Sequence, residues 1–136
     1  SDIRGGFYGL TQDSSIQDMV TACFNSVAFQ TKEITSILEK YDIKVSSLLV
    51  DGGMVKNKTF CQILANSLEK EILQPQNVES TALGACIVAM ASSGDDISNI
   101  KASDMDIFKP NVENTISIKE SYHEWKSYLI HTMRPK

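Results

Sequence analysis

Residues 50–57, with the sequence VDGGMVKN, decide the fold, because an Asp-Gly-Gly sequence between apolar residues fits two different structures. It can form a tight hairpin turn between two strands, for which Asp-Gly is a strong signal. It can also end a buried strand, where glycines let a ligand approach the backbone. The sequence on either side of the glycines distinguishes these two structures.

The flanking residues favour a strand followed by a helix. Residues 45–50, VSSLLV, end in an apolar run that is typical of an interior strand covered on both faces. After Val55 the chain becomes polar, and apolar residues then recur at helical spacing over residues 58–70, with Asn57 where an N-cap belongs. The hairpin is therefore excluded, and we expect Gly52 and Gly53 at the carboxyl end of a strand.

This position favours a ligand site but does not establish one. Open α/β sheets bind ligands at the carboxyl ends of their strands, and the N–H groups at a helix start attract anionic oxygens. However, the sequence has neither the Gly-x-Gly-x-x-Gly of dinucleotide-binding folds nor the Gly-Lys-Ser/Thr of P-loops. The residues alone leave a ligand contact and a purely structural turn both open. Asp51 in particular could cap its own turn.

The rest of the chain alternates strands and helices. We expect a strand over residues 4–11, a long helix on an apolar surface from Ser15, its N-cap, to Tyr41, and a strand over 71–74 that Pro75 stops. Residues 80–91 predict a helix buried on most sides, and residues 92–115 a polar surface excursion. The last helix has an apolar stripe of Tyr122, Trp125 and Leu129. This order predicts an α/β fold with a partly parallel sheet.

Composition limits the classes of function. A net charge of -4 without a cluster of basic residues argues against a nucleic-acid partner, and no apolar run is long enough to span a membrane. We expect a soluble intracellular chain whose three cysteines, Cys23, Cys61 and Cys86, are reduced and buried. No pair of Cys or His residues has metal-ligand spacing, so no metal site is expected.

No complete catalytic constellation is found in the sequence. Asp104 and Asp106 lie in the polar excursion and are interpreted as a solvated loop rather than an acid/base pair. His123 is interpreted as a surface residue of the last helix.

The ordered segments RGGFYGLT, FNSVAFQTKEI, LLVDGGMVKNKTFCQILANSL, LQPQNVESTALGACIVAMASSG and YHEWKSYL resemble the C-terminal part of the glycerol-kinase branch of the FGGY carbohydrate kinases. The resemblance extends from about Arg4 to Leu129. Its most telling pieces are residues 50–54, 79–85 and 28–31, and the last of these favours the glycerol kinases over the xylulose and ribulose kinases. It implies a partial ribonuclease-H-like, or actin-like, domain: a mixed sheet flanked by helices, with a C-terminal helix.

The resemblance also implies a function. FGGY kinases transfer the γ-phosphoryl group of ATP to a polyol hydroxyl with Mg²⁺, in a cleft between two domains. Their Gly-Gly-x-x-x-Asn stretch contacts the nucleotide, which places Gly53 and Asn57 at ATP or ADP. Gly52 would support this contact, and Met54 is a possible neighbour of the adenine. The implied parent converts glycerol and ATP to sn-glycerol 3-phosphate and ADP, and is cytoplasmic and homo-oligomeric.

By the same resemblance, residues 1–136 correspond to the C-terminal portion of the second, nucleotide-binding domain. The general base and the glycerol-binding residues of the family precede this stretch. We therefore expect no catalytic residue and no kinase activity in the chain by itself.

Two residues depart from the family pattern. Asn25 stands where the family usually has Glu, and Asn66 stands where it usually has Asp. Each replacement removes a charge and keeps hydrogen-bonding capacity. Membership of another FGGY sugar-kinase branch, or of a non-catalytic actin-like nucleotide-binding or interaction protein, therefore stays as an alternative.

Overall fold

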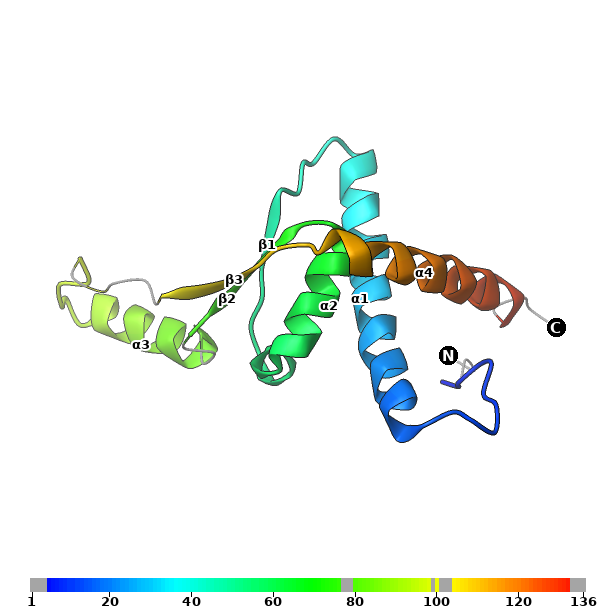
Figure 1. The fold of residues 1–136 in the computed structure, drawn as a ribbon. Coiled ribbons are helices and arrows are strands. Elements are labelled where there is room, and N and C mark those ends of the chain that lie inside the picture. Colours follow the sequence, from blue (N-terminus) through cyan, green and yellow to red (C-terminus); the bar gives the residue numbers. More distant parts are fainter. Residues whose placement is uncertain (1–4, 77–79, 99, 101–103, 133–136) are drawn as a thin grey trace.

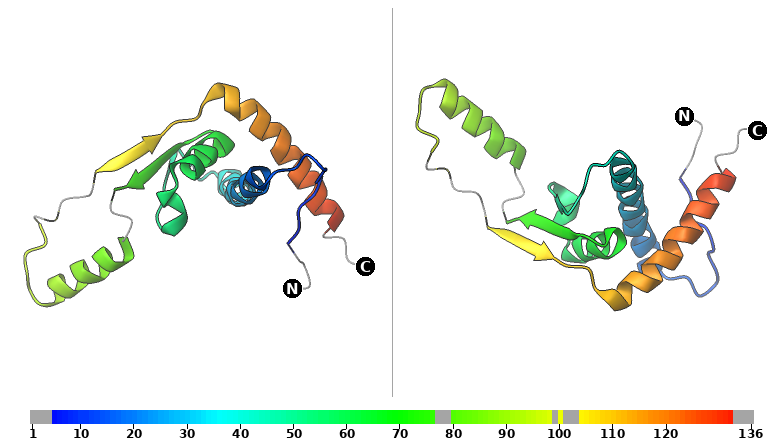
Figure 2. Two further views of the ribbon diagram at one scale, coloured as in Figure 1. Left: turned by 60° about the horizontal axis from the view of Figure 1, so that its bottom comes forward. Right: turned by 90° about the horizontal axis from the view of Figure 1, so that it is seen from above.

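The structure is a computed structural model that describes residues 5–76, 80–98, 100 and 104–132. The helices are α1 (Ile16–Lys40), the 3-10 helix η1 (Gly53–Lys56), α2 (Lys58–Leu68), α3 (Ser80–Ser92) and α4 (Val112–Thr132). The strands are β1 (Ser47–Leu49), β2 (Glu71–Pro75) and β3 (Met105–Phe108) (Figure 1). Helices α1, α2 and α4 gather at one end of the sheet, whereas α3 stands apart from them (Figures 1 and 2).

The sheet is mixed, as the sequence predicts. Its strand order is β1-β2-β3, with β1 parallel and β3 antiparallel to β2. Leu48, Ile72 and Phe108 lie side by side in one row of this sheet. Ile72 is fully buried, and Leu48 and Phe108 pack against the same hydrophobic core. This row holds the sheet against α2.

The core forms mainly between α1, α2 and β2. Apolar residues of α2 recur every three or four positions and so occupy one face of the helix. The buried cluster consists of Ala28, Val55, Phe60, Cys61, Leu64, Ala65, Leu68 and Ile72. Val55 of η1 belongs to this cluster, so the core reaches directly under the glycine turn.

The prediction for α1 is confirmed almost to the residue. Ser15 is the N-cap and forms a capping box with Asp18, and Tyr41 is the C-cap. Ala28 and Phe29 are buried. The apolar surface under the helix is narrower than expected, however, because Ile16 and Ile34 are 77% and 60% exposed.

The apolar stripe of α4 is also confirmed. The rings of Tyr122 and Trp125 lie 5.5 and 5.6 Å from the ring of Phe29 on α1. Beside them, Glu33 accepts hydrogen bonds from the Tyr122 hydroxyl and from Lys126 Nζ. The bond from Lys126, followed by that from Tyr122, lowers the pKa of the Glu33 carboxyl. An aromatic and ionic contact thus joins α4 to α1.

Two predicted strands need correction. Residue 4 of the first lies outside the described residues, and residues 5–11 form no strand. A strand needs a hydrogen-bonded neighbour, and none of the described strands pairs with this segment. The second, β1, does form but is an edge strand, and Leu49 is 63% exposed on the open face of the sheet. The expectation that β1 is covered on both faces is therefore wrong.

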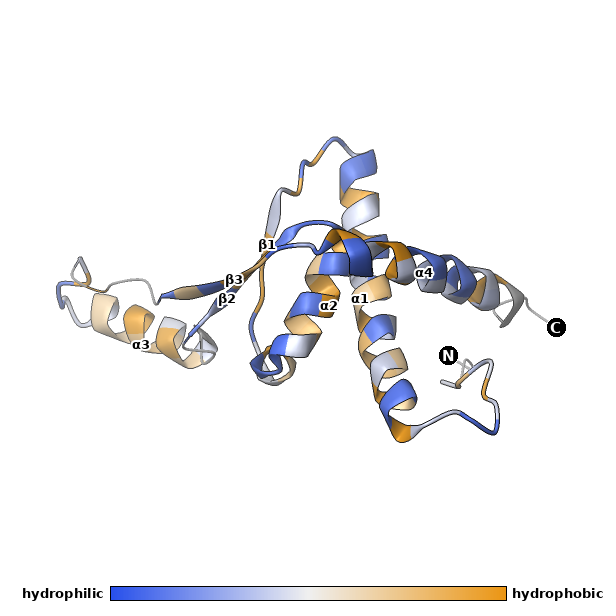
Figure 3. Cartoon of the chain, in the orientation of Figure 1, coloured by the Kyte–Doolittle hydropathy of each residue, from blue (hydrophilic) through white to orange (hydrophobic). Residues whose placement is uncertain are grey.

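Helix α3 forms as predicted, but it is not buried. It has no charged residue, and Figure 3 shows mostly apolar colours along it. Nevertheless, Leu83 and Val88 are 39% and 69% exposed, and only Gly84 and Ile87 among the helix residues whose burial is described are half-buried. Its composition predicts burial, but no described element packs closely on it.

The polar excursion over residues 92–115 is likewise corrected. Residues 105–108 of this stretch form β3, and α4 begins at Val112. Met105, Asp106, Ile107 and Phe108 are too few to show a clear strand pattern within the surrounding polar residues. Phe108 anchors this stretch, because its side chain packs against the core.

The cysteines divide into two kinds. All three are free thiols, and Cys61 is buried as predicted. Cys23 and Cys86 are exposed, which contradicts their predicted burial. Among the described residues, no helix is both long and apolar enough to cross a bilayer.

Candidate functional site

The glycine turn, residues 51–57, connects β1 to α2 at the carboxyl end of β1 (Figure 1). The parallel pairing continues one residue beyond β1, because the Val50 N–H donates to the Leu73 carbonyl at 2.9 Å. The chain then leaves the sheet and forms η1 before α2 begins. The predicted order of strand, glycine turn and helix is confirmed, while η1 itself was not predicted.

Gly52 is required by the backbone. Its φ of 103° and ψ of 177° lie in a region that is essentially restricted to glycine. Asp51 stabilises this conformation, because its Oδ1 accepts a hydrogen bond of 2.7 Å from the Gly52 N–H. Asp51 therefore caps its own turn, in agreement with the structural interpretation of this carboxylate.

Neither the backbone conformation nor the packing requires a glycine at position 53. Its φ is not positive, and a Cβ added at this position would meet no heavy atom within 4 Å. The protein itself thus gives no steric reason for glycine here. Space above Gly53 is open, which is the geometry that a ligand close to the backbone needs.

Asn57 is the N-cap of α2, as predicted. Its Oδ1 accepts hydrogen bonds from the N–H groups of Thr59 and Phe60, at 2.9 and 3.3 Å. Since the oxygen is used in this way, the side-chain NH₂ remains as the group that can donate to a ligand. The cap also fixes the direction of this amide at the start of the helix.

The four residues proposed from the sequence lie together on one exposed turn. Gly52, Gly53 and Asn57 are exposed, and the Met54 side chain is 47% exposed. Val55 points the other way, into the core. The turn thus exposes its backbone, the Asn57 amide and the Met54 side chain to solvent. Val55 anchors the turn in the core.

Sequence reasoning missed two contacts that hold this turn. Lys58, the first residue of α2, lies 3.0 Å from Asp106 Oδ2 on β3. The Cys61 thiol lies 3.2 Å from the Val55 carbonyl oxygen. Neither contact was predicted, because β3 was interpreted as a loop and Cys61 only as a reduced, buried residue.

The two asparagines that we expect to depart from the family pattern, Asn25 and Asn66, have different environments. Asn66 is buried, and its Oδ1 accepts hydrogen bonds from Gln62 Nε2 and from the Asn111 N–H, at 3.0 and 2.8 Å. Asn25 has a buried Oδ1 for which the described residues offer no donor. Asn66 thus makes neutral hydrogen bonds, whereas the buried Asn25 Oδ1 has no donor among the described residues.

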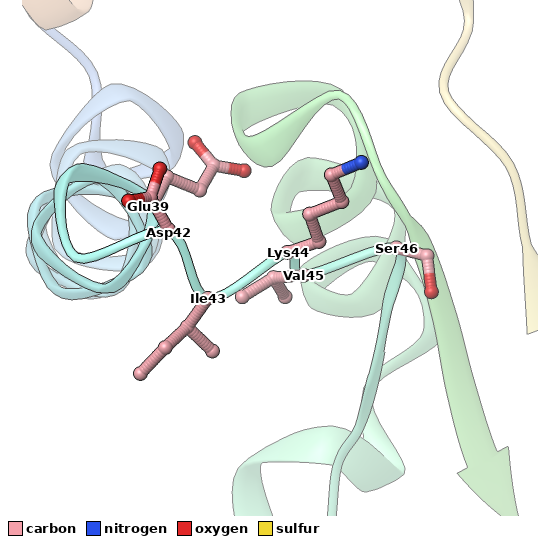
Figure 4. Close-up of a pocket in the computed structure, with 6 residues that line it drawn as sticks. All are labelled: Glu39, Asp42, Ile43, Lys44, Val45 and Ser46. Atoms are coloured by element: carbon pink, nitrogen blue, oxygen red, sulfur yellow. The ribbon is translucent and has the colours of Figure 1, made fainter.

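A cavity in the described part of the chain does not belong to the turn. It has a volume of about 490 Å³ and lies where the chain passes from α1 to β1, at the opposite end of β1 (Figure 4). Its lining residues are Glu39, Asp42, Ile43, Lys44, Val45 and Ser46. It is open and contains none of the predicted site residues, so we assign it no role. No group of three metal-ligating side chains occurs in the described part of the chain.

Known proteins are similar to this chain in sequence and in fold. Residues 1–93 match the C-terminal domain of the FGGY family of carbohydrate kinases. The glycerol kinase of Haloferax volcanii is 42% identical over 67% of this chain and 18% of its own length. The glycerol kinase of Marinomonas sp. is 37% identical over 92% of this chain and 26% of its own length. The chain thus spans about a quarter or less of these relatives.

Solved structures of kinases have the same fold. A glycerol kinase of Plasmodium falciparum with ADP superimposes with a TM-score of 0.77 and 27% identity, over 100% of this chain and 28% of that one. A xylulose kinase of Brucella ovis has a TM-score of 0.80 and 22% identity, over 98% of this chain and 29% of that one. The predicted α/β kinase fold is confirmed. The chain therefore belongs to the FGGY family of carbohydrate kinases, to whose C-terminal domain residues 1–93 correspond.

Proposed function

We propose that this chain is the C-terminal part of an ATP-dependent glycerol kinase and forms one wall of its adenine-nucleotide site. The observation that carries the proposal is the glycine turn, which is open at Gly53 in a chain whose relatives include glycerol kinases. In this proposal Gly53 and Asn57 contact ATP or ADP, Gly52 supports the turn, and Met54 lies beside the adenine.

Each of these residues has a chemical reason for its role. The missing Cβ of Gly53 lets the nucleotide approach the backbone closely. The Asn57 NH₂ donates to an acceptor of the nucleotide, because its Oδ1 is already bonded to the N–H groups of Thr59 and Phe60. The half-exposed Met54 side chain offers a polarisable apolar surface to a base.

The proposed reaction transfers the γ-phosphoryl group of ATP to glycerol. A glycerol hydroxyl oxygen forms a bond to the γ-phosphorus, the bond from this phosphorus to the β-phosphate oxygen breaks, and the hydroxyl proton passes to a base. Positioning and charge stabilisation supply most of the catalysis of such transfers. We assign this chain the positioning of the nucleotide, and assign neither the base nor a Mg²⁺ ligand to its described residues. In the same proposal, Mg²⁺ binds together with the nucleotide. The full-length kinase is cytoplasmic and binds glycerol through residues outside this chain.

A substrate panel tests the proposal. The full-length kinase is assayed with ATP against glycerol, xylulose, ribulose and gluconate. We expect turnover of glycerol to exceed that of each sugar by at least about 100-fold in kcat/KM, because a site that pairs with the hydroxyls of one polyol leaves polar groups unpaired with another. Rapid turnover of a sugar with glycerol inert would assign the chain to a sister branch of the family. Absence of phosphoryl transfer to any of these would favour a non-catalytic nucleotide-binding protein.

A further inference from the structure

A buried thiol, that of Cys61, links the glycine turn to α2. Cys61 is fully buried, one helical turn after Asn57. Its Sγ donates to the carbonyl oxygen of Val55 at 3.2 Å. Val55 lies inside η1, so this bond joins the middle of the turn to the helix that follows it. The Cys61 N–H also donates to the Asn57 carbonyl, at 3.2 Å.

The same thiol faces the sheet. Its Sγ lies 3.8 Å from the side-chain Oε1 of Gln74, a buried polar residue of β2. Gln74 pairs in register with Asp106 of β3, which binds Lys58 at the start of α2. Cys61 therefore stands at the point where the turn, α2 and the sheet meet.

The Cys61 thiol is suited to remain a hydrogen-bond donor at neutral pH. Burial, followed by the charge of Asp106, raises the pKa of the Cys61 thiol. The thiol therefore keeps its proton at neutral pH and can donate it to a carbonyl oxygen. An apolar residue of similar size would fill the same space without this bond.

The geometry points to Cys61 as a positioning residue that holds η1 in the conformation that presents Gly53 and Asn57 to the nucleotide. It does not touch the nucleotide itself, and its role rests on the proposed function of the turn. The thiol limits the motion of η1 by fixing the Val55 carbonyl, so that the outward residues of the turn are arranged before the ligand arrives. Such preorganisation lowers the entropy lost on binding.

Amide hydrogen exchange in the 136-residue chain tests this inference without a nucleotide. Cys61→Ala removes the donor, and Cys61→Ser keeps one in a side chain of nearly the same size. The reporter is the Asn57 N–H, which donates to the Met54 carbonyl across η1 at 3.1 Å. Leu68→Val, at the far end of α2, is the matched core variant.

We expect the exchange rate of the Asn57 amide, relative to the amides of β2, to rise about fivefold in C61A, as the loss of one hydrogen bond of about 1 kcal/mol predicts. It should remain within about twofold of wild type in C61S and in L68V. Equal relative exchange in C61A and C61S would overturn the inference, since the donor would then be irrelevant.

The affinity for ADP connects the turn to binding, and it is measured by calorimetric titration of the full-length kinase carrying the same substitutions. We expect C61A to bind ADP several-fold more weakly than C61S. A rise in exchange without any loss of affinity would overturn the positioning role. A Gly53→Ala variant of the full-length kinase separates this result from a failure of the proposed function. If G53A also binds ADP like wild type, the nucleotide does not contact this turn, and if the wild-type kinase does not bind ADP, the proposed function itself fails.

Discussion

Gly52 and Gly53 are adjacent but are glycines for different reasons. Gly52 has a φ that side-chain-bearing residues rarely adopt, whereas Gly53 has an ordinary backbone and open space around it. The sequence predicts that both lie at a strand end. It does not show that they are glycines for different reasons, because this depends on their backbone dihedral angles. It is the structure that makes them distinguishable by experiment.

We predict that Gly52→Ala lowers the free energy of unfolding by roughly 1–3 kcal/mol, because alanine is strained at a φ of 103°. Gly53→Ala should change it by less than about 0.5 kcal/mol, since the added methyl group meets nothing. Urea denaturation of both variants measures the difference. Equal stability of the two would show that the turn has another conformation.

Asn57 allows the cap to be separated from the ligand contact. Asn57→Asp keeps an oxygen that accepts from the Thr59 and Phe60 N–H groups, but loses the NH₂ donor. We expect it to leave stability within about 0.5 kcal/mol and to weaken ADP binding. Asn57→Ala should cost about 1 kcal/mol of stability through loss of the cap. Calorimetric titration with ADP, together with thermal unfolding, checks both; an N57D variant with wild-type affinity would argue against the contact.

At the scale of elements, we expect the contact between α1 and α4 to depend on pH. The bonds from Lys126 and Tyr122 hold the pKa of Glu33 below its ordinary value of 4.5. A depressed carboxyl pKa contributes stability above the unfolded pKa, and this contribution is lost as the pH falls through the folded value. The relevant window therefore lies below about pH 4.5.

We predict that wild type loses more unfolding free energy than Glu33→Gln when the pH falls from 6 to 3, because glutamine has no proton to gain. Urea denaturation at several pH values in this range measures the two curves. Parallel curves for wild type and E33Q would show that the ionic contact does not stabilise the helix pair. The difference between the two curves should be small, because Glu33 is partly exposed and solvent screens its ion pair with Lys126.

The elements were predictable to different degrees. Helix α1 was predicted accurately because its cap residue, its length and its periodicity agree. Strand β3 was missed because a short strand within a polar stretch has too few residues to show alternation. The burial of α3 was overestimated for a different reason: composition reports the preference of a helix for apolar surroundings, but not which surface supplies them.

At the scale of the whole molecule, the described residues have one core with large apolar surfaces around it. Ile72 lies at its centre, where β2 meets α2. Exposed apolar side chains lie on the open sheet face and on α3, such as Ile107, which is 56% exposed, and Val88, which is 69% exposed. Stability should therefore depend on a small set of residues around α2.

We predict that Ile72→Ala lowers the free energy of unfolding by about 2–5 kcal/mol, as truncations of fully buried residues do. Val88→Ser should change it by less than about 0.5 kcal/mol, because the side chain is already in contact with solvent. Chemical denaturation of the 136-residue chain compares them. A comparable loss in V88S would mean that α3 packs on another part of the chain.

The fold class followed from the sequence, because strands alternate with helices over nearly the whole chain. The turn between β1 and α2 followed as well, since the residues after the glycines have helical spacing. What the turn binds did not follow from these patterns. A strand end with glycines is compatible with a ligand or with a simple turn, and only the resemblance to FGGY kinases favours a nucleotide.

The central claim is that the nucleotide contacts the backbone at Gly53, and the ADP affinity of a Gly53→Ala variant of the full-length kinase tests it most directly. Gly6→Ala is the matched control, because Gly6 also has open space around its Cβ position and lies outside the turn. We predict that G53A binds ADP at least about tenfold more weakly than wild type, since one methyl group would occupy the space of the ligand. G6A should bind like wild type. Wild-type affinity of G53A would contradict the account.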